Sequence, residues 1–187
     1  MCKAVDKCMM IKSIKLLEKI GGKSECAIEY KPNVGIITMS DSIFAGDSED
    51  KSGPILLKGF TDFGCKVDHK KVLPDGSNEL IKTIESWIED NVELIITTGG
   101  TGLSPRDLTI NILENNFDSK LSGIEQALHA YGRVNKKTAM LSRLSAGVIK
   151  NTIVICLPGS IDAVKDALRL LIPTIFHSFH MMKGEKH

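Results

Sequence analysis

The chain has 187 residues, of which 42% are hydrophobic and 25% are charged. This length suits one domain, with or without an appendage, and is enough to bury an apolar core without disulfides or metals. The formal net charge is +1, from 24 basic and 23 acidic residues. That balance argues against a broad nucleic-acid-binding surface, although it is compatible with a local basic pocket for a phosphorylated ligand.

The cysteines and the apolar runs indicate the cellular setting. Five cysteines without a CxxC pair favour reduced thiols over a disulfide framework or a structural zinc site. Lys3, Asp6 and Lys7 interrupt the first apolar residues, which is unlike a secretory signal. No apolar run approaches the ~20 residues that span a bilayer. We therefore expect a soluble, cytoplasmic protein without a membrane or nucleic-acid partner.

A boundary is expected between residues 21 and 33. Gly21-Gly22 and Pro32-Asn33 break the pattern on either side of it. The apolar side chains before the boundary are too few to form a core of their own. We therefore divide the chain into residues 1–30, which need an external partner surface, and a domain of residues 31–187.

From Val34 onwards the pattern alternates between strands and helices. Short apolar runs predict strands at residues 34–39, 94–97 and 153–157. A weak alternation predicts a further strand at residues 66–73. Helices are predicted at residues 52–63, 107–114 and 123–131, after Ser77, and after Pro158-Gly159. Ser52 and Ser77 are the predicted N-caps. A kink or restart of the last helix is predicted at Pro173. This order predicts an α/β fold with a doubly wound, mostly parallel sheet and helices on both faces.

Three features follow predicted strands at the edge where such sheets bind ligands. The loop TTGGTG at residues 97–102 offers backbone amides that could hold phosphate oxygens, although a simple strand-to-helix turn is the alternative. Asp107 could cap the next helix or hold Mg²⁺ beside bound phosphates. The turn LPGS at residues 157–160 would direct a helix N-terminus toward an anion.

Other polar side chains near these loops allow two interpretations each. Asp50 belongs to an acidic group after the first strand, and most such groups are merely solvated. Glu125 stands out on an otherwise apolar helix, and Arg143 could grip a phosphate or lie on the surface. His177 and His180 have HxxH spacing, but without a second ligand pair we expect no metal site there.

An ordered set of motifs runs through residues 34–182. It consists of GIITMS at 35–40, DKSG at 50–53, LPD at 73–75, TTGGTG at 97–102 with Asp107, GIE at 123–125, LSR at 141–143 and LPGS at 157–160. Together these motifs resemble the molybdopterin-binding family of the MoaB and Mog type. The resemblance implies a Mg²⁺-dependent reaction of ATP with molybdopterin that gives adenylylated molybdopterin and pyrophosphate. It also implies a homotrimer or hexamer, with other enzymes of the cofactor pathway as candidate partners.

The same resemblance implies roles for individual residues. Asp50, Asp107 and Glu125 would be catalytic, with Asp107 as the candidate ligand of Mg²⁺. The pterin and the nucleotide would be bound by a larger set: Ser52, Gly53, Thr98, Gly99, Gly100, Thr101, Gly102, Ser142, Arg143, Pro158, Gly159 and Ser160. A non-catalytic oligomeric carrier or scaffold for the pterin is the alternative.

Residues 1–30 carry a second resemblance. MCKAVDK at 1–7, LLEK at 16–19 and GGKS at 21–24 resemble the carboxyl end of cyclic pyranopterin monophosphate synthase, the MoaC-type enzyme. Lys3 matches the catalytic lysine of that family, but the aspartate and histidine expected upstream do not accompany it. We therefore expect a piece of a two-enzyme fusion, without synthase activity in these residues.

Overall fold

The computed structural model describes residues 30–182, apart from the side chains of Asn135, Pro173 and His180. The predicted synthase remnant, Lys3 included, lies outside the described residues. Among the described helices, none combines the length and apolarity needed to cross a membrane.

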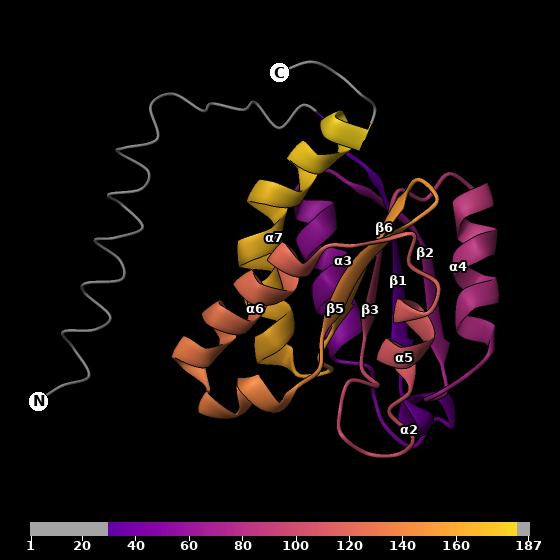
Figure 1. Ribbon diagram of the computed structural model, residues 1–187. Helices are drawn as coiled ribbons and strands as arrows, with labels where there is room; N and C mark the ends of the chain where they lie inside the picture. Colours follow the sequence, from indigo (N-terminus) through magenta and orange to yellow (C-terminus); the bar gives the residue numbers. More distant parts are fainter. Residues whose placement is uncertain (1–29, 183–187) are drawn as a thin grey trace, which may run out of the picture.

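A six-stranded mixed sheet forms the centre of the domain (Figure 1). In spatial order it contains β2 (Lys66–Leu73), β1 (Asn33–Met39), β3 (Leu94–Thr98), β6 (Thr152–Leu157), β5 (Ser145–Ile149) and β4 (Ser119–Lys120). The first four are mutually parallel, and β5 and β4 complete the sheet in antiparallel pairings. The predicted α/β class and mostly parallel sheet are confirmed.

Helices cover both faces of this sheet. The helical elements are α2 (Asp41–Phe44), α3 (Ser52–Asp62), α4 (Glu79–Glu89), α5 (Thr109–Glu114), α6 (Ser122–Asn135), the 3-10 helix η1 (Lys137–Leu141) and α7 (Ile161–Met182). In Figure 1, α3, α6 and α7 lie on one side of the strands, while α4 and α5 lie on the other. This arrangement is the predicted doubly wound one.

The apolar core is divided into two clusters by the sheet. Successive residues of β1 alternate between them, because side chains along a strand point to opposite faces. Ile36 packs with Phe60 of α3 and Phe176 of α7, whereas Ile37 packs with the buried side of α4, including Ile84. All five of these side chains are almost fully buried, so both helical layers are anchored to the central strands.

Two helix boundaries differ from the prediction. The helix expected from Asp107 begins at Thr109, because residues 102–106 form bends and a turn and the chain at 107–108 is not yet helical. The expected restart at Pro173 does not occur, since α7 runs from Ile161 to Met182 as one helix. Leu171, Ile172 and Phe176 are buried on either side of that position, and this packing holds the helix together across the residue that lacks an amide donor.

Candidate functional site

Three loops meet at the carboxyl ends of β1, β3 and β6, the parallel strands at the centre of the sheet. The amide of Gly99 donates to the carbonyl of Leu157 at 3.0 Å, and the Thr98 hydroxyl donates to the Pro158 carbonyl at 3.2 Å. The Ser52 hydroxyl donates to the Gly159 carbonyl at 2.8 Å. The three segments therefore form one continuous rim.

At Gly99 the backbone of the loop after β3 lies directly against the backbone of β1. The φ of Gly99 is +100°, and a Cβ placed there would lie 2.1 Å from the Met39 carbonyl oxygen. A Cβ at Gly159 would lie 3.4 Å from the Gly99 Cα. Glycine is required at position 99 both for its backbone conformation and for the contact with β1.

The carboxylate of Asp50 organises the start of α3. Its Oδ1 accepts hydrogen bonds from the amides of Ser52 at 3.1 Å and Gly53 at 2.8 Å, and its Oδ2 accepts one from the Thr38 hydroxyl at 2.8 Å. The prediction that Ser52 caps this helix is therefore wrong. Asp50 satisfies the free amides of the first turn, which leaves the Ser52 hydroxyl to bind the Gly159 carbonyl.

The space in front of Asp50 is a cleft of about 390 Å³, which we call the rim cleft. Its lining residues come from all three loops: Thr38, Met39, Ser40, Ile43, Glu49, Asp50, Lys51, Ser52, Thr98, Gly99, Gly159, Ser160 and Ile161. The Ser160 hydroxyl accepts a hydrogen bond from the Ala163 amide at 3.3 Å, so it caps α7. Ser52 and Ile161, the first residues of α3 and α7, line the rim cleft, so the N-termini of both helices adjoin it.

Arg143 fixes the loop that leaves β3. Its backbone amide donates to the Thr101 carbonyl at 3.0 Å. Its guanidinium donates to the Gly102 carbonyl at 3.0 Å, to Asn111 Oδ1 at 2.9 Å and to the Asp107 carbonyl. Arg143 is therefore occupied mainly by protein acceptors, and its predicted contact with a ligand phosphate stays a prediction.

The carboxylate of Asp107 also stabilises its own loop. Its Oδ2 accepts a hydrogen bond from the Ser104 amide at 3.0 Å, and a Cβ at Gly102 would lie 2.7 Å from the same oxygen. Oδ1 accepts no hydrogen bond from the described residues. Mg²⁺ commonly binds one or two carboxylates together with substrate phosphates, so Asp107 has a free oxygen of the right chemistry for the predicted ligand role.

Two further clefts extend from the rim toward α6. The first, which we call the helix cleft, has about 740 Å³ and adjoins Thr101, Ser142, Pro158, Gly159 and Ser160. The second, which we call the glutamate cleft, has about 510 Å³ and is lined by Glu125, Ser142 and Arg143. Most of the predicted site residues thus lie along adjoining clefts rather than in one pocket: Glu125 and Arg143 belong to the end remote from Asp50. Four of the predicted residues line none of the three clefts: Gly53, Gly100, Gly102 and Asp107.

Sequence reasoning missed three charged groups at these sites. Lys120 and Glu114 line the glutamate cleft beside Glu125. Asp75, quoted above only as part of a motif, exchanges hydrogen bonds with Asp41: each backbone amide donates to the other's carboxylate. Burial is the largest cause that raises the pKa of Asp75, and the carboxylates of Asp41 and Asp107 raise it further. The LPD motif was the only available signal for Asp75.

No group of three or more His, Cys, Asp or Glu side chains within residues 30–182 is arranged to hold a metal ion. His177 lies on α7, and the side chain of His180 is outside the described part. A metal bound at Asp107 would therefore depend on ligand oxygens supplied by a substrate.

Comparison with known proteins identifies the family. The model of the probable molybdopterin binding domain matches residues 35–177. The chain belongs to this family. The resemblance of residues 34–182 to MoaB and Mog proteins is thereby confirmed, whereas the synthase-like resemblance of residues 1–30 stays a prediction.

Individual relatives give the same result. A molybdenum cofactor biosynthesis bifunctional protein of Chlorobaculum tepidum is 53% identical over 187 residues, covering all of this chain and 60% of that protein. A molybdopterin adenylyltransferase of Pyrococcus furiosus is 36% identical over 148 residues, covering 76% of this chain and 86% of that protein. The chain thus spans about three fifths of the length of the bifunctional relative.

Solved structures share the fold. The crystal structure of the tungsten cofactor synthesizing protein MoaB from Pyrococcus furiosus superposes with a TM-score of 0.76 at 30% sequence identity, covering 83% of this chain and 98% of that chain. The residues that match the family model, 35–177, include every lining residue of the three clefts.

Proposed function

We propose that this protein acts in molybdenum cofactor biosynthesis by transferring AMP from ATP to molybdopterin, with release of pyrophosphate. The observation that carries the proposal is the rim, where the loops after β1, β3 and β6 are joined by hydrogen bonds. The names of the adenylyltransferase relatives support the choice of reaction.

The reaction requires positioning more than covalent participation by the protein. An oxygen of the molybdopterin phosphate forms a bond to the α-phosphorus of ATP, and the bond from that phosphorus to the bridging oxygen breaks. The pyrophosphate leaves with the bonding electron pair. In phosphoryl-type transfer, alignment of the two groups and stabilisation of negative charge supply most of the rate enhancement.

The chain offers suitable groups for that stabilisation. The N-terminus of α7 adjoins the rim cleft. After Gly99, the amides of Gly100, Thr101 and Gly102 donate to no backbone acceptor within the described residues, and such amides attract phosphate oxygens. Asp107 would hold Mg²⁺, which when bound neutralises phosphate charge. Asp50 keeps the first turn of α3 in place, so we assign it a positioning role within the proposed site.

The proposal is tested by measuring pyrophosphate release with molybdopterin, ATP and Mg²⁺. We expect release to depend on molybdopterin, and Asp107→Asn to lose most of it while Asp62→Asn keeps the wild-type rate. Asp62 is an exposed residue at the end of α3 that forms an ion pair with Lys58. Wild-type turnover by Asp107→Asn would refute the role of Asp107, and no release by the wild-type chain would refute the transferase.

A non-catalytic pterin carrier is the second candidate. It is favoured by the hydrogen bonds of Asp50 and Arg143, because the partners of both side chains are groups of the protein itself rather than groups of a substrate. This candidate predicts molybdopterin binding in a titration without pyrophosphate above background.

We also propose a homotrimer or hexamer. Three large apolar side chains near the glutamate cleft are exposed: Leu103, Met140 and Leu141. Exposed apolar groups of this size often mark interfaces. Sedimentation of the full chain as a monomer at micromolar concentration would contradict this proposal.

A further inference from the structure

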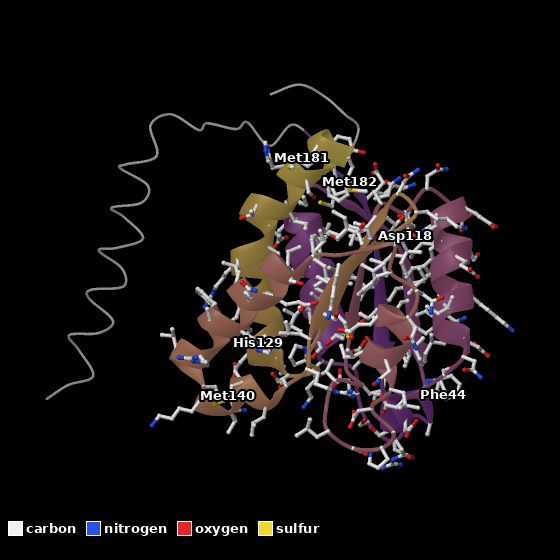
Figure 2. The ribbon with its side chains drawn as sticks, viewed as in Figure 1. Phe44, Asp118, His129, Met140, Met181 and Met182 are labelled. Carbon is white, nitrogen blue, oxygen red and sulfur yellow. The ribbon has the colours of Figure 1, made fainter. Side chains whose placement is uncertain are left out.

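A cleft of about 560 Å³ lies at the amino ends of the central strands, and we call it the base cleft. Asn33 begins β1, Glu93 directly precedes β3 and Thr152 begins β6, and all three residues line this cleft. Because β1, β3 and β6 are parallel, the base cleft lies at the end of the sheet opposite the rim. Figure 2 shows Met182 of α7, which also lines it, at the end of the molecule remote from Phe44 of α2.

The charged side chain of the base cleft already has its partners. Glu93 Oε2 accepts a hydrogen bond from the Asn33 amide at 3.2 Å, and Oε1 accepts one from the Tyr30 hydroxyl. The Glu93 amide donates to the Asn33 carbonyl at 3.0 Å, and the Ile153 amide donates to the Glu93 carbonyl at 2.9 Å. Glu93 is the one charged residue among the described lining residues, so the base cleft does not favour a charged ligand.

The remaining walls combine apolar side chains with asparagines. Phe179 of α7 is 2% exposed, Ile88 of α4 is partly buried, and Met182 is 39% exposed. Asn91 and Asn151 line the cleft as exposed residues. An asparagine side chain both donates and accepts hydrogen bonds, so it can satisfy the N–H and C=O groups of a main chain that crosses the cleft. A short peptide segment with apolar side chains fits these walls.

Chain connectivity brings such a segment to the base cleft. Tyr30, the first described residue, lines it and is held by its hydrogen bond to Glu93 and by the ring of Phe179, whose centroid lies 5.7 Å from that of Tyr30. The reach of an extended chain places the Cα of Ile28 within roughly 7 Å of the Cα of Tyr30 on any path. Residues 25–29 have the sequence ECAIE, which supplies apolar side chains at this distance.

The other end of the described chain is a poorer occupant. The helix α7 ends at Met182, which lines the base cleft, so residues 183–187 are within reach of it as well. Their sequence, KGEKH, contains no apolar side chain. Burial of charged groups without partners is unfavourable, whereas burial of an isoleucine side chain is favourable. The segment before Tyr30 is therefore the better match.

We propose that residues 25–29 occupy the base cleft of their own chain, with Ile28 packed between Ile88 and Met182. The apolar residues before position 31, which are too few to form a core, thereby gain a surface on which to pack. The seven residues of β1 separate the base cleft from the rim by roughly 20 Å. The docked segment therefore holds whatever precedes it at the end of the sheet opposite the rim, and the rim stays open.

The test measures the rate at which N-ethylmaleimide modifies Cys26 in the full chain. Cys8, which precedes the docked segment, is the reference, and trypsin separates the two thiols because Lys12 and Lys23 lie between them. The rate in urea divided by the rate in native protein gives a protection factor for each thiol. We expect the factor for Cys26 to exceed that for Cys8 roughly 10-fold or more, because burial of one isoleucine side chain favours the docked state to this extent.

Two substitutions on opposite sides of the contact identify the source of the protection. Ile28→Asn and Ile88→Asn each remove an apolar contact without adding a charge beside the thiol, and each should lower the Cys26 factor to the reference value. Circular dichroism checks that both variants fold. If Ile88→Asn does not fold, Ile28→Asn decides alone, because it leaves residues 30–182 unchanged.

Two matched controls should keep the wild-type protection of Cys26. Ile11→Asn makes the same change before the docked segment. Met181→Asn alters an exposed neighbour of Met182 that is not among the lining residues of the base cleft. The protection should also be the same at 1 and at 50 μM protein, as it must be for docking within one chain.

Three results would overturn the proposal. One is an equal protection factor for Cys26 and Cys8 in the wild type, and another is a Cys26 factor that Ile28→Asn leaves unchanged. The third is a Cys26 factor that rises with protein concentration, because the segment would then dock in a second copy.

The proposal does not depend on the transfer reaction, since protection of Cys26 is measured without substrate. Ile28→Asn should release pyrophosphate at the wild-type rate if the wild type releases it, because the base cleft is remote from the rim. Loss of release in this variant alone would contradict the placement of the docked segment away from the rim.

Discussion

Replacing Gly99 with alanine tests the geometry on which the rim depends. The new Cβ would lie 2.1 Å from the Met39 carbonyl oxygen, which belongs to the backbone of a buried strand and cannot rotate away. A side chain at a φ of +100° costs about 1–3 kcal/mol, and overpacking adds about 1–3 kcal/mol. We therefore expect a loss of about 2–6 kcal/mol of unfolding free energy, a large share of the ~5–15 kcal/mol of a typical domain.

The assay for this prediction combines urea unfolding with pyrophosphate release. Gly123→Ala is the matched control, because Gly123 lies in α6 and a Cβ there would meet no atom within 4 Å. We expect Gly123→Ala to be neutral or to stabilise the protein by up to ~1 kcal/mol. If Gly99→Ala unfolds at the same urea concentration as the wild type and retains its turnover, the account of the rim is wrong.

Three further predictions concern single side chains. Arg143→Ala removes the guanidinium hydrogen bonds that fix the loop after β3. We expect steady-state kinetics to show KM values for ATP and molybdopterin raised by about 10-fold or more. Unchanged KM values would contradict this prediction. Because the pKa of Asp75 is raised above 3.8 in the folded state, mainly by burial, its ionisation costs stability as pH rises through the raised pKa. Asp75→Asn should therefore unfold at higher urea than the wild type at pH 7, and the difference should disappear as pH falls toward 3.8; a difference that grows toward low pH would refute the assignment. Burial raises the pKa of Cys156 to about 12. Iodoacetamide at pH 8 should therefore leave Cys156 unmodified in the native protein and modify it in urea, as measured by peptide mass spectrometry. Rapid modification of Cys156 in the native protein would contradict its burial.

The parallel part of the fold was predictable because its strands are strongly patterned. The runs at residues 34–39, 94–97 and 153–157 are apolar and bounded by breakers, and they occupy the centre of the sheet. By contrast, β5 is the sequence SAGVI, whose first three residues carry little strand preference. It is a strand because it pairs with β6 across the turn at Lys150, whose φ is +54°. That pairing depends on tertiary context.

The rim was predictable for a different reason. Carboxyl ends of parallel strands lie at one edge of a sheet, so TTGGTG and LPGS had to be neighbours once their strands were assigned. The partners of Asp50 and Arg143 could not be derived in this way. Asp50 takes the capping position that the sequence suggested for Ser52, and Arg143 turns toward Asn111, 32 residues before it in the chain. Sequence spacing identifies a polar residue near a loop but not the acceptor it binds.

The most direct test is a crystal structure of the protein with molybdopterin, Mg²⁺ and a non-hydrolysable ATP analogue. The account predicts phosphate oxygens within hydrogen-bonding distance of the Gly100–Gly102 amides, beside the rim cleft. Phosphates bound at the opposite end of the sheet, in the cleft lined by Tyr30, Glu93 and Phe179, would contradict it.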